Sequence, residues 1–475
     1  MAGVELMTES TTVILNVLAE RYASKEMRQI WSREEKIRLE RNLWIAVMKA
    51  QSKHGVPISP EEISKYEAVV DQIDLGSIDD RERHLRHDVK ARIEEFNSLA
   101  GLQLIHLGMT SRDLTENVEL VQVRNSLGLI RSEVIGILNL FASRMNQYSD
   151  LVIVGRSHNV PAQLTTFGKR LATVATELLF ALERLDSLIS RLPLRGLRGP
   201  VGTGQDLLDL VGDDADLVES EVAQGLGFDR ILPSTGQIYP RSIDFEVIST
   251  LVQLASAPSN FATLTRLMSG QGLMSEGFKE GQVGSSAMPH KINARSSERI
   301  NGLSVVLKGY LSMVSEISGN QWNEGDVSCS VVRRVALPDA FFTIDGIFQT
   351  MATILGEMVL FEEAISKEVE RELPFTSTTR LLMEAVRRGM GREDAHKIIQ
   401  RHSLSALEKS RKGEDHSFLR DIGADVNLPI SMDEALGIAI DHTQLVGNSK
   451  IQIETVSERV ALLGSNQFDV FKEIR

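Results

Sequence analysis

The sequence is short of the residues that cross-link, break or stiffen a chain. Its 475 residues include one cysteine and 12 prolines, and only 5% of them are aromatic. The single cysteine, Cys329, excludes an internal disulfide, and no CxxC or HExxH spacing indicates a zinc site. Proline falls below its usual share of about 5%. So few helix breakers in so long a chain favour long helices.

The chain also lacks long apolar runs and an excess of positive charge. No uninterrupted apolar run approaches the roughly 20 residues that span a bilayer, and acids stand where a signal peptide has a basic region. The formal net charge of -13, spread along the chain, argues against a nucleic-acid surface. We therefore expect a cytoplasmic protein without membrane or nucleic-acid partners. A small anion in a local basic pocket is compatible with this composition.

What the sequence has in abundance is apolar residues at helical spacing. From 171 to 192, leucine, valine and isoleucine recur every three or four residues, which predicts one long helix. Similar stripes cover 134–145, 243–254, 300–314 and 341–361. No segment alternates convincingly with a period of two. The sequence therefore predicts an all-α protein built around an elongated bundle, since helices of about 20 to 30 residues are about 30 to 45 Å long.

The length implies more than one domain, because single cores stop growing beyond about 250 to 300 residues. We expect an N-terminal helical domain at 1–114 and a central long-helix bundle at 115–366. A C-terminal helical domain at 367–475 follows the break "LPFTSTTR" at 373–380. Loops at the distant ends of such a bundle share one site only if those ends converge.

Two glycine- or threonine-containing segments precede predicted helices. The segment "RGLRGPVGTGQD" (195–206) lacks the Lys-Ser/Thr ending of a P-loop and follows a helix instead of a strand. It therefore favours a helix-to-helix turn with backbone amides near a ligand. In "HLGMTSRDLTEN" (106–117), Thr110, Ser111 and Asp113 have the spacing of a helix N-cap. The same helix start also suits a carboxylate or phosphate.

Two further segments are unusually rich in polar groups. In "GRSHNVPAQLTTFGKR" (155–170), His158 lies in a polar loop with more donors and acceptors than a solvated histidine needs. In "GSSAMPHKINARSSERING" (284–302), Asn293 can cap the helix that follows. A plain connecting loop does not explain why two serines, a histidine and a lysine crowd together there.

Other polar segments read, when taken alone, as solvated surface. These are "RYASKEMRQIWS" (21–32) and "RHDVKARIEEF" (86–96), each of which places a basic residue at a possible helix start. His84 and His87 are three residues apart, but no cluster of carboxylates accompanies them. A metal site is therefore not expected.

Taken together, the polar segments resemble the signature regions of the fumarase/aspartase superfamily, whose hallmark is a GSSxMPxKxN loop. The resemblance is closer to the adenylosuccinate lyase family and extends from Arg21 to about His396. It implies a three-domain helical subunit and a homotetramer with a twenty-helix core, whose active sites draw on three subunits. The segments that carry it are "RYASKEMRQIWS", "RHDV", "HLGMTSRDLTENVE", "GRSHNVPAQLTTFGKR", "GSSAMPHKINARSSE", "QWNEGDVSCSVVRRVALPDAFF" and "LPFTSTTRLLMEAVRRGMGREDAH".

The resemblance also implies a reaction, the cofactor-free β-elimination of fumarate from succinylated purine nucleotides. These are adenylosuccinate, which gives AMP, and the succinylated carboxamide ribotide of purine synthesis. By the match, Ser285 is the general base and His158 the general acid, Glu298 pairs with His158, and Lys291 supplies a cation. Fixed donors and cations are needed because the carbanion next to a carboxylate carries two negative charges. No metal or cofactor is implied.

The substrate-binding residues are implied in the same way. Thr110 and Ser111 match contacts to the succinyl carboxylates. Arg21, Tyr22, Ser330 and Arg334 match the phosphate site. The full set is Arg21, Tyr22, Arg86, His87, Asp88, His106, Thr110, Ser111, Gln163, Gln237, Arg241, Ser286, Met288, Asn293, Ser330 and Arg334.

One departure from the family pattern and two alternatives stay open. Many family members have an arginine where this chain has Gly325, so the role of that arginine falls to another residue or is dispensable.

Another superfamily lyase, such as argininosuccinate lyase, shares the fold and the serine loop. Its substrate has no phosphate, so it has no use for the predicted phosphate ligands Arg21, Tyr22, Ser330 and Arg334. A non-catalytic helical oligomer is the alternative from another class. The presence of Ser285, Lys291 and His158 together counts against it.

Overall fold

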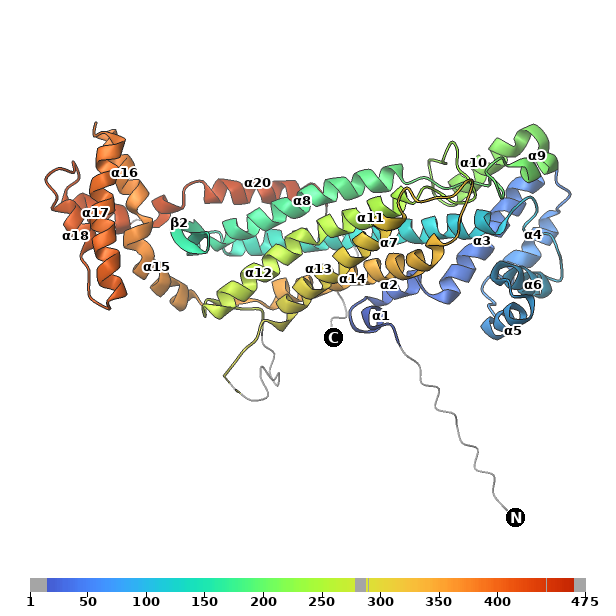
Figure 1. Cartoon of the computed structure of the whole chain (residues 1–475), viewed down its shortest axis with the longest axis horizontal. Coiled ribbons are helices and arrows are strands. Elements are labelled where there is room, and N and C mark those ends of the chain that lie inside the picture. Colours follow the sequence, from blue (N-terminus) through green and yellow to red (C-terminus); the bar gives the residue numbers. More distant parts are fainter. Residues whose placement is uncertain (1–14, 278–287, 289, 441, 465–475) are drawn as a thin grey trace, which may run out of the picture.

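We describe the chain from a computed structural model, which covers residues 15–277, 288, 290–440 and 442–464. The molecule is elongated and mostly helical. Long helices run side by side through its middle, and groups of shorter helices lie at its two ends (Figure 1). This arrangement confirms the predicted all-α class and the elongated bundle.

Six helices form the middle of the molecule around one large core. The longest, α7, has 37 residues and is about 55 Å long, so the stripe predicted at 134–145 is only part of it. By composition α7 is apolar enough to cross a membrane, but 50% of its most apolar stretch is buried inside the molecule. The bounds are α7 (Ser111–Gln147), α8 (Phe167–Arg191), α11 (Ser242–Leu254), α12 (Ser256–Gly270), α13 (Arg295–Ile317) and α14 (Cys329–Glu357).

At one end of the bundle, short helices surround a second core in which the rings of Trp44 and Tyr66 pack against Phe96. Helices from later in the chain complete this core through Leu207 and Val218. The helices at this end are α3 (Arg33–Lys53), α4 (Pro60–Glu67), α5 (Leu75–Leu85), α6 (Asp88–Ala100), α9 (Gln205–Val211), the 3-10 helix η1 (Gly212–Asp214) and α10 (Ala215–Gly225). Two short helices, α1 (Val17–Arg21) and α2 (Lys25–Ile30), pack instead against α14 and α7.

The opposite end holds a third core, formed after residue 360. The predicted break at 373–380 is shorter than expected, because α15 continues through Pro374 to Thr376 and α16 begins at Thr378. The hydroxyl of Ser377 donates to the Pro374 carbonyl at 3.0 Å, which satisfies the acceptor at this helix end. The helices are α15 (Glu362–Thr376), α16 (Thr378–Arg387), α17 (Arg392–Arg411), α18 (Phe418–Gly423), α19 (Met432–Ile440) and the 3-10 helix η2 (His442–Val446).

The last described helix, α20 (Ser449–Ala461), leaves this end and lies back along the bundle (Figure 1). It packs on α7 and α8, and its Ile453 and Val460 belong to the central core. The final segment therefore fastens the C-terminal end of the chain to the long helices.

Two short antiparallel ribbons interrupt the helices: β1 (Val152–Ser157) with β2 (Val160–Thr166), and β3 (Met274–Ser275) with β4 (Val359–Leu360). The first replaces the loop expected at 155–170. His158 and Asn159 form its two-residue turn with positive φ angles of 52° and 62°, as a hairpin turn of the I′ type requires. A register shift between Gly155 and Arg156 breaks the alternation that would have indicated a strand.

Candidate active site

A cavity of about 210 Å³ lies where three helices begin. His87 caps α6, Ser111 opens α7, and Ser330 lies in the first turn of α14. The free N–H groups and positive dipole of a helix start favour an anion. The lining residues are Lys36, His87, Asp88, Val89, Ser111, Arg112, Thr115, Glu119, Ser330 and Arg334. Half of them belong to the predicted substrate-binding set: His87, Asp88, Ser111, Ser330 and Arg334.

Cationic side chains outnumber carboxylates in this cavity, with Lys36, Arg112 and Arg334 against Asp88 and Glu119. The Lys36 Nζ atom lies 4.0 Å from Oε1 of Glu119. Burial alone would raise the pKa of Glu119, but the charges of an adjacent arginine and of Lys36 lower it to about 2. Arg334 is exposed. The cavity therefore has a net positive charge and suits an anionic ligand.

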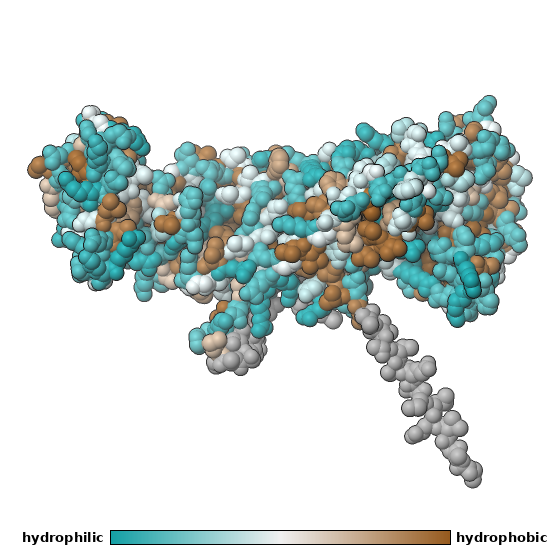
Figure 2. Space-filling view, in the orientation of Figure 1, coloured by the Kyte–Doolittle hydropathy of each residue, from teal (hydrophilic) through white to brown (hydrophobic). Residues whose placement is uncertain are grey.

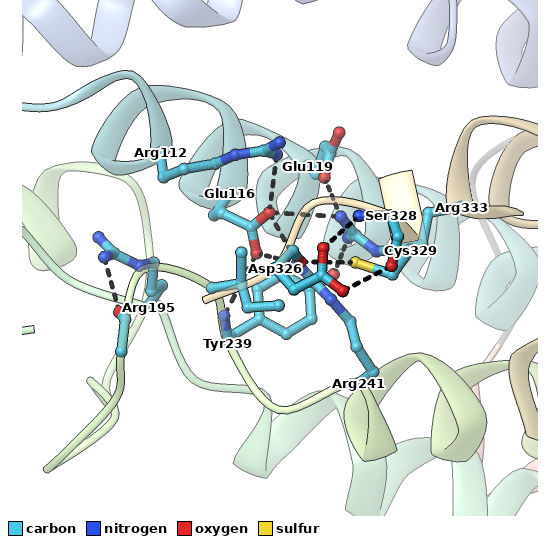
Figure 3. A network of polar contacts seen from close by, with 12 residues as sticks. Arg112, Glu116, Glu119, Arg195, Tyr239, Arg241, Asp326, Ser328, Cys329 and Arg333 are labelled. Atoms are coloured by element: carbon cyan, nitrogen blue, oxygen red, sulfur yellow. Dashed lines mark hydrogen bonds and ion pairs between the residues drawn. The ribbon is translucent and has the colours of Figure 1, made fainter. Parts of the chain in front are cut away.

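Behind the cavity, a buried network of charges joins three helices (Figure 3). Glu116 of α7 accepts from Nη2 of Arg241 at 2.9 Å. Arg333 of α14 donates through Nε to Oδ2 of Asp244 on α11 at 2.7 Å and through Nη1 to Oε2 of Glu119 at 2.6 Å. These contacts are shielded from solvent, so salt screens them little. They fix the starts of α7, α11 and α14, and with them Ser111, Ser330 and Arg334.

Arg241, a predicted substrate ligand, belongs to this network and does not line the cavity. Its side chain is only 1% exposed, and its guanidinium carbon lies 4.4 Å from the centre of the Tyr239 ring. In the single chain, Arg241 therefore supports the cavity from behind.

The glycine-rich segment 195–206 packs against the start of α7 with its backbone. The N–H groups of Arg198 and Gly199 donate to Oδ1 of Asp113 at 2.9 and 3.0 Å, and the same carboxylate pairs with the buried Arg195. The other oxygen of Asp113 accepts from the Thr110 N–H at 2.7 Å. The N–H groups of Arg198 and Gly199 are thus used within the chain, where they hold the start of α7 with Thr110 and Ser111 in place.

His106 and Gln237 lie beside these segments. Burial, assisted by the positive charges of His87 and Lys90, lowers the pKa of His106 to about 4. The ring is therefore neutral, and its Nδ1 accepts from Nε1 of Trp44 at 3.0 Å. The Gln237 N–H donates to the Glu324 carbonyl at 2.6 Å.

His158 and Gln163 lie at the other end of the long helices, on the β1–β2 hairpin (Figure 1). His158 is exposed at the hairpin tip. Gln163 donates through Nε2 to Oγ1 of Thr379 on α16 at 2.8 Å, and Arg156 donates to Oε1 of Glu368 on α15 at 2.5 Å. The C-terminal helices therefore hold the hairpin that presents His158.

The predicted residues of the serine segment form a third group, at the start of α13. Lys291 and Glu298 are exposed there. Asn293 lines a second cavity, of about 190 Å³, with His290 and Glu276. The helix begins after Ala294, not after Asn293, so the predicted Asn293 cap is wrong. Ser285 and Ser286 lie outside the described residues, while Met288 directly precedes this group.

Arg21 and Tyr22, predicted phosphate ligands, end the first short helix and lie against the middle of α14. A Cβ atom at Gly346 would come within 2.7 Å of the Tyr22 Cβ. Arg334 precedes Gly346 by 12 residues, which is about 18 Å along the helix. Arg86, the remaining member of the predicted set, is the exposed C-cap residue of α5 and directly precedes the cavity residue His87.

One chain therefore does not bring the predicted residues into a single site. Ser111 and Gln147 mark the two ends of α7, about 54 Å apart, and the hairpin of His158 begins just after the second end. The residues gather in three groups: the cavity, the hairpin, and the start of α13, where the guanidinium carbon of Arg299 lies 5.7 Å from the centre of the Tyr22 ring.

Two cations of the cavity were not predicted. Arg112 directly follows Ser111, and its Nη1 lies 3.2 Å from Oε1 of Glu116. Its position next to a predicted ligand was a usable signal. Lys36 lies in the charged run "SREEKIRLER" of α3, which reads as a solvated helix face. Only the packing of α3 beside α7 reveals that it faces a cavity.

Comparisons with protein families and curated proteins indicate a similarity to adenylosuccinate lyases. Residues 12–309 match the family described as "Lyase", and residues 374–456 match the family described as "Adenylosuccinate lyase C-terminus". The adenylosuccinate lyase of Saccharomyces cerevisiae is 32% identical over 448 residues, which cover 92% of each chain. The enzyme of the same name from Methanothermobacter thermautotrophicus is 32% identical over 85% of this chain and 88% of its own.

Solved structures share the fold over nearly the whole length. The 3-carboxy-cis,cis-muconate lactonizing enzyme of Pseudomonas putida superposes with a TM-score of 0.81 at 19% identity, covering 94% of this chain and 99% of its own. A fumarate lyase from Mesorhizobium sp. BNC1 gives 0.79 at 17% identity, covering 92% and 98%. At such low identity the likeness concerns the fold alone.

Proposed function

The chain belongs to the adenylosuccinate lyase family, a carbon–nitrogen lyase family of the fumarase/aspartase superfamily, and on this premise we propose how its residues perform the elimination. The substrates are adenylosuccinate and the succinylated carboxamide ribotide of purine synthesis. The products are fumarate together with AMP or the free carboxamide ribotide.

The reaction begins with removal of a proton from the carbon next to one succinyl carboxylate. Ser285, acting as its alkoxide, takes this proton and becomes a hydroxyl. The electron pair of the broken C–H bond moves into the carboxylate, where Lys291 and Asn293 stabilise the added negative charge. The pair then forms the double bond of fumarate as the C–N bond breaks. His158, held by Glu298, donates a proton to the departing nitrogen. Each proton and electron pair is thereby accounted for without a metal or cofactor.

The positively charged cavity is the anion-binding part of this site. Ser330 and Arg334 bind the phosphate together with Arg21 and Tyr22, while Thr110 and Ser111 bind a succinyl carboxylate. The observation that carries this assignment is the convergence of three helix starts on one cavity with an excess of cationic side chains. Arg86, His87, Asp88, His106, Gln163, Gln237, Ser286 and Met288 complete the binding residues of the assembled site, while the buried Arg241 supports the cavity from behind.

The complete active site is shared by subunits of a homotetramer, with segments from three of them. The separation of the cavity, the hairpin and the start of α13 in one chain supports this assembly. An apolar surface also supports it: Figure 2 shows hydrophobic residues over the middle of the bundle, where α11, α13 and α14 lie. Val305 and Val331, for example, are 70% and 68% exposed in the single chain. Such a patch is typical of an interface. We place the enzyme in the cytoplasm, where nucleotide precursors are made.

The decisive experiment follows fumarate release by the purified protein from adenylosuccinate and, separately, from argininosuccinate. Release from adenylosuccinate is expected, and release from argininosuccinate alone would sink the purine assignment. No release from either substrate would favour the non-catalytic helical oligomer.

The two catalytic assignments are tested by Ser285→Ala and His158→Gln. Each is expected to lower kcat by at least about 100-fold, because each removes a proton-transfer group, while substrate binding stays measurable. Near-normal turnover by Ser285→Ala would show that another group is the base.

A further inference from the structure

The helix α13 begins without a cap of its own. Its N-cap residue is Ala294, whose side chain has no oxygen to accept the first N–H groups. Those groups instead donate to a glutamate 20 residues earlier. The Ser296 N–H donates to Oε1 of Glu276 at 2.7 Å, and the Ser297 N–H donates to Oε2 at 2.9 Å. The Ser297 hydroxyl also donates to Oε2, at 2.9 Å.

This glutamate is itself held firmly. It is 8% exposed and directly follows β3, whose residues Met274 and Ser275 pair with β4 at the end of α14. The next residue, Gly277, has a φ of 105°, and a Cβ there would lie 2.6 Å from the Cβ of Glu357. The backbone on either side of Glu276 therefore lies against the end of α14, and the carboxylate projects from this support to α13.

The residues that this carboxylate fixes surround the proposed chemistry. Lys291 and Asn293 lie five and three residues before Ser296, and Glu298 directly follows Ser297. Without a cap, the first turn of a helix loses partners for its N–H groups and frays. A frayed turn would change the positions of all three side chains at once. The negative charge of Glu276 is also favourable at the positive end of the helix dipole.

We propose that Glu276 is a positioning residue for the elimination: by capping α13 from outside, its carboxylate fixes Lys291, Asn293 and Glu298 for catalysis. The inference rests on the proposed function of those three residues. Glu276 does not touch substrate in this proposal, so its effect on turnover passes through the first turn of α13.

The test uses the full-length protein in three variants beside the wild type. Glu276→Ala removes the external cap. Glu276→Ala combined with Ala294→Asp supplies a local cap, because an aspartate at the N-cap position accepts from the same two N–H groups. Glu62→Ala is the matched control, since Glu62 accepts from the N–H and hydroxyl of Ser59 in a capping box of α4, outside the proposed site.

Two measurements are made on each variant. Hydrogen exchange of the peptide covering 295–300 reports whether the first turn is capped, independently of any substrate. Fumarate release from adenylosuccinate gives kcat and KM. For Glu276→Ala we expect faster exchange in this peptide and a kcat lowered by about 10- to 100-fold, as small misplacements of catalytic groups produce. KM changes less, since Ser330 and Arg334, two of the proposed phosphate contacts, line the other cavity.

The double variant is expected to recover both slow exchange and most of kcat, while Glu62→Ala leaves both near wild type. Unchanged exchange or unchanged kcat in Glu276→Ala overturns the inference, and so does a kcat that stays low when the double variant restores slow exchange. If Glu276→Ala does not fold, Glu276→Gln, which keeps one acceptor oxygen, is expected to show smaller changes in the same direction. A wild type that releases no fumarate instead refutes the proposed function, while the exchange data still decide whether Glu276 caps α13.

Discussion

At Gly325 the packing leaves room for a hydrogen atom and no side chain. A Cβ there would lie 2.5 Å from the Cβ of Gln237, and a Cβ at Gly236 would lie 1.9 Å from the Glu324 carbonyl oxygen. Two backbone segments therefore meet through a pair of glycines. An arginine at position 325, as the family resemblance implies, has no space in this arrangement, so the glycine is part of how this chain positions Gln237.

The substitution Gly325→Ala is therefore expected to displace Gln237, a proposed substrate ligand. Overpacking of this kind costs about 1–3 kcal/mol, so we expect a lower free energy of unfolding and a higher KM for adenylosuccinate. Urea unfolding and steady-state kinetics measure the two effects. Gly128→Ala on α7 is the control, because a Cβ there meets no atom within 4 Å. A wild-type KM in Gly325→Ala would contradict this account of Gln237.

At the scale of helices, a buried pair of carboxyl groups joins α7 and α14 to the start of α2. Gln349 donates through Nε2 to Oε1 of Glu133 at 2.7 Å, and the Ser24 N–H donates to Oδ2 of Asp345 at 2.5 Å. Burial and the neighbouring Asp345 raise the pKa of Glu133 well above its usual value, and burial raises that of Asp345. The folded protein therefore binds protons here that the unfolded chain releases.

This pair makes stability depend on pH in a defined direction. A glutamate in the unfolded chain releases its proton at about pH 4.3, whereas Glu133 in the folded protein releases its proton at a higher pH. The stabilisation that the bound proton provides is complete below the pKa of the glutamate in the unfolded chain. It is lost as the pH rises through the pKa of Glu133 in the folded protein. Glu133→Gln removes the titrating group, so we expect the free energy of unfolding of this variant, relative to wild type, to improve as the pH rises above about 4.3.

Urea unfolding at a series of pH values measures this difference. The control is Glu177→Gln on α8, a partly exposed glutamate that accepts from Nδ2 of Asn260 at 2.7 Å. Parallel pH profiles for wild type and Glu133→Gln would show that the buried pair does not hold the extra proton.

At the scale of the whole molecule, the shape of the chain separates the groups that the reaction needs. The hairpin with His158 and the cavity with Arg334 lie at opposite ends of the long helices (Figure 1). In the proposed assembly, a complete site takes ends from different subunits. Two variants that each lack a different proposed group are then expected to complement each other in mixed tetramers.

We expect a mixture of His158→Gln and Arg334→Gln proteins to regain activity after the subunits are dissociated and reassembled. Each variant alone, treated in the same way, stays nearly inactive. In a mixed tetramer some sites receive both native groups, whereas sites built within single chains would each lack one of them. Fumarate release before and after reassembly measures the effect, and no recovery in a tetramer shown to be mixed would contradict shared sites.

The sequence predicted the long helices well, because an apolar stripe such as that at 171–192 repeats with the period of an α-helix. It did not predict the hairpin of His158, where a register shift hides the alternation, or the true extent of α7. Among the site residues, the sequence singled out Ser330 and Arg334 but missed Lys36 and Glu276. A lysine in a charged helix and a glutamate after a short strand have no local pattern that distinguishes them from solvated residues.

The sequence by itself determined the helical class, the periodicity of the bundle and the segments that carry the side chains proposed to react, because these depend on residue type and near-neighbour spacing. Only the tertiary structure decided which helix starts converge on the charged cavity, which carboxylate caps α13, and that His158 and Arg334 lie at opposite ends of one chain. These facts depend on contacts between residues far apart in sequence. Such contacts follow from the packing of whole helices, and no local pattern encodes them.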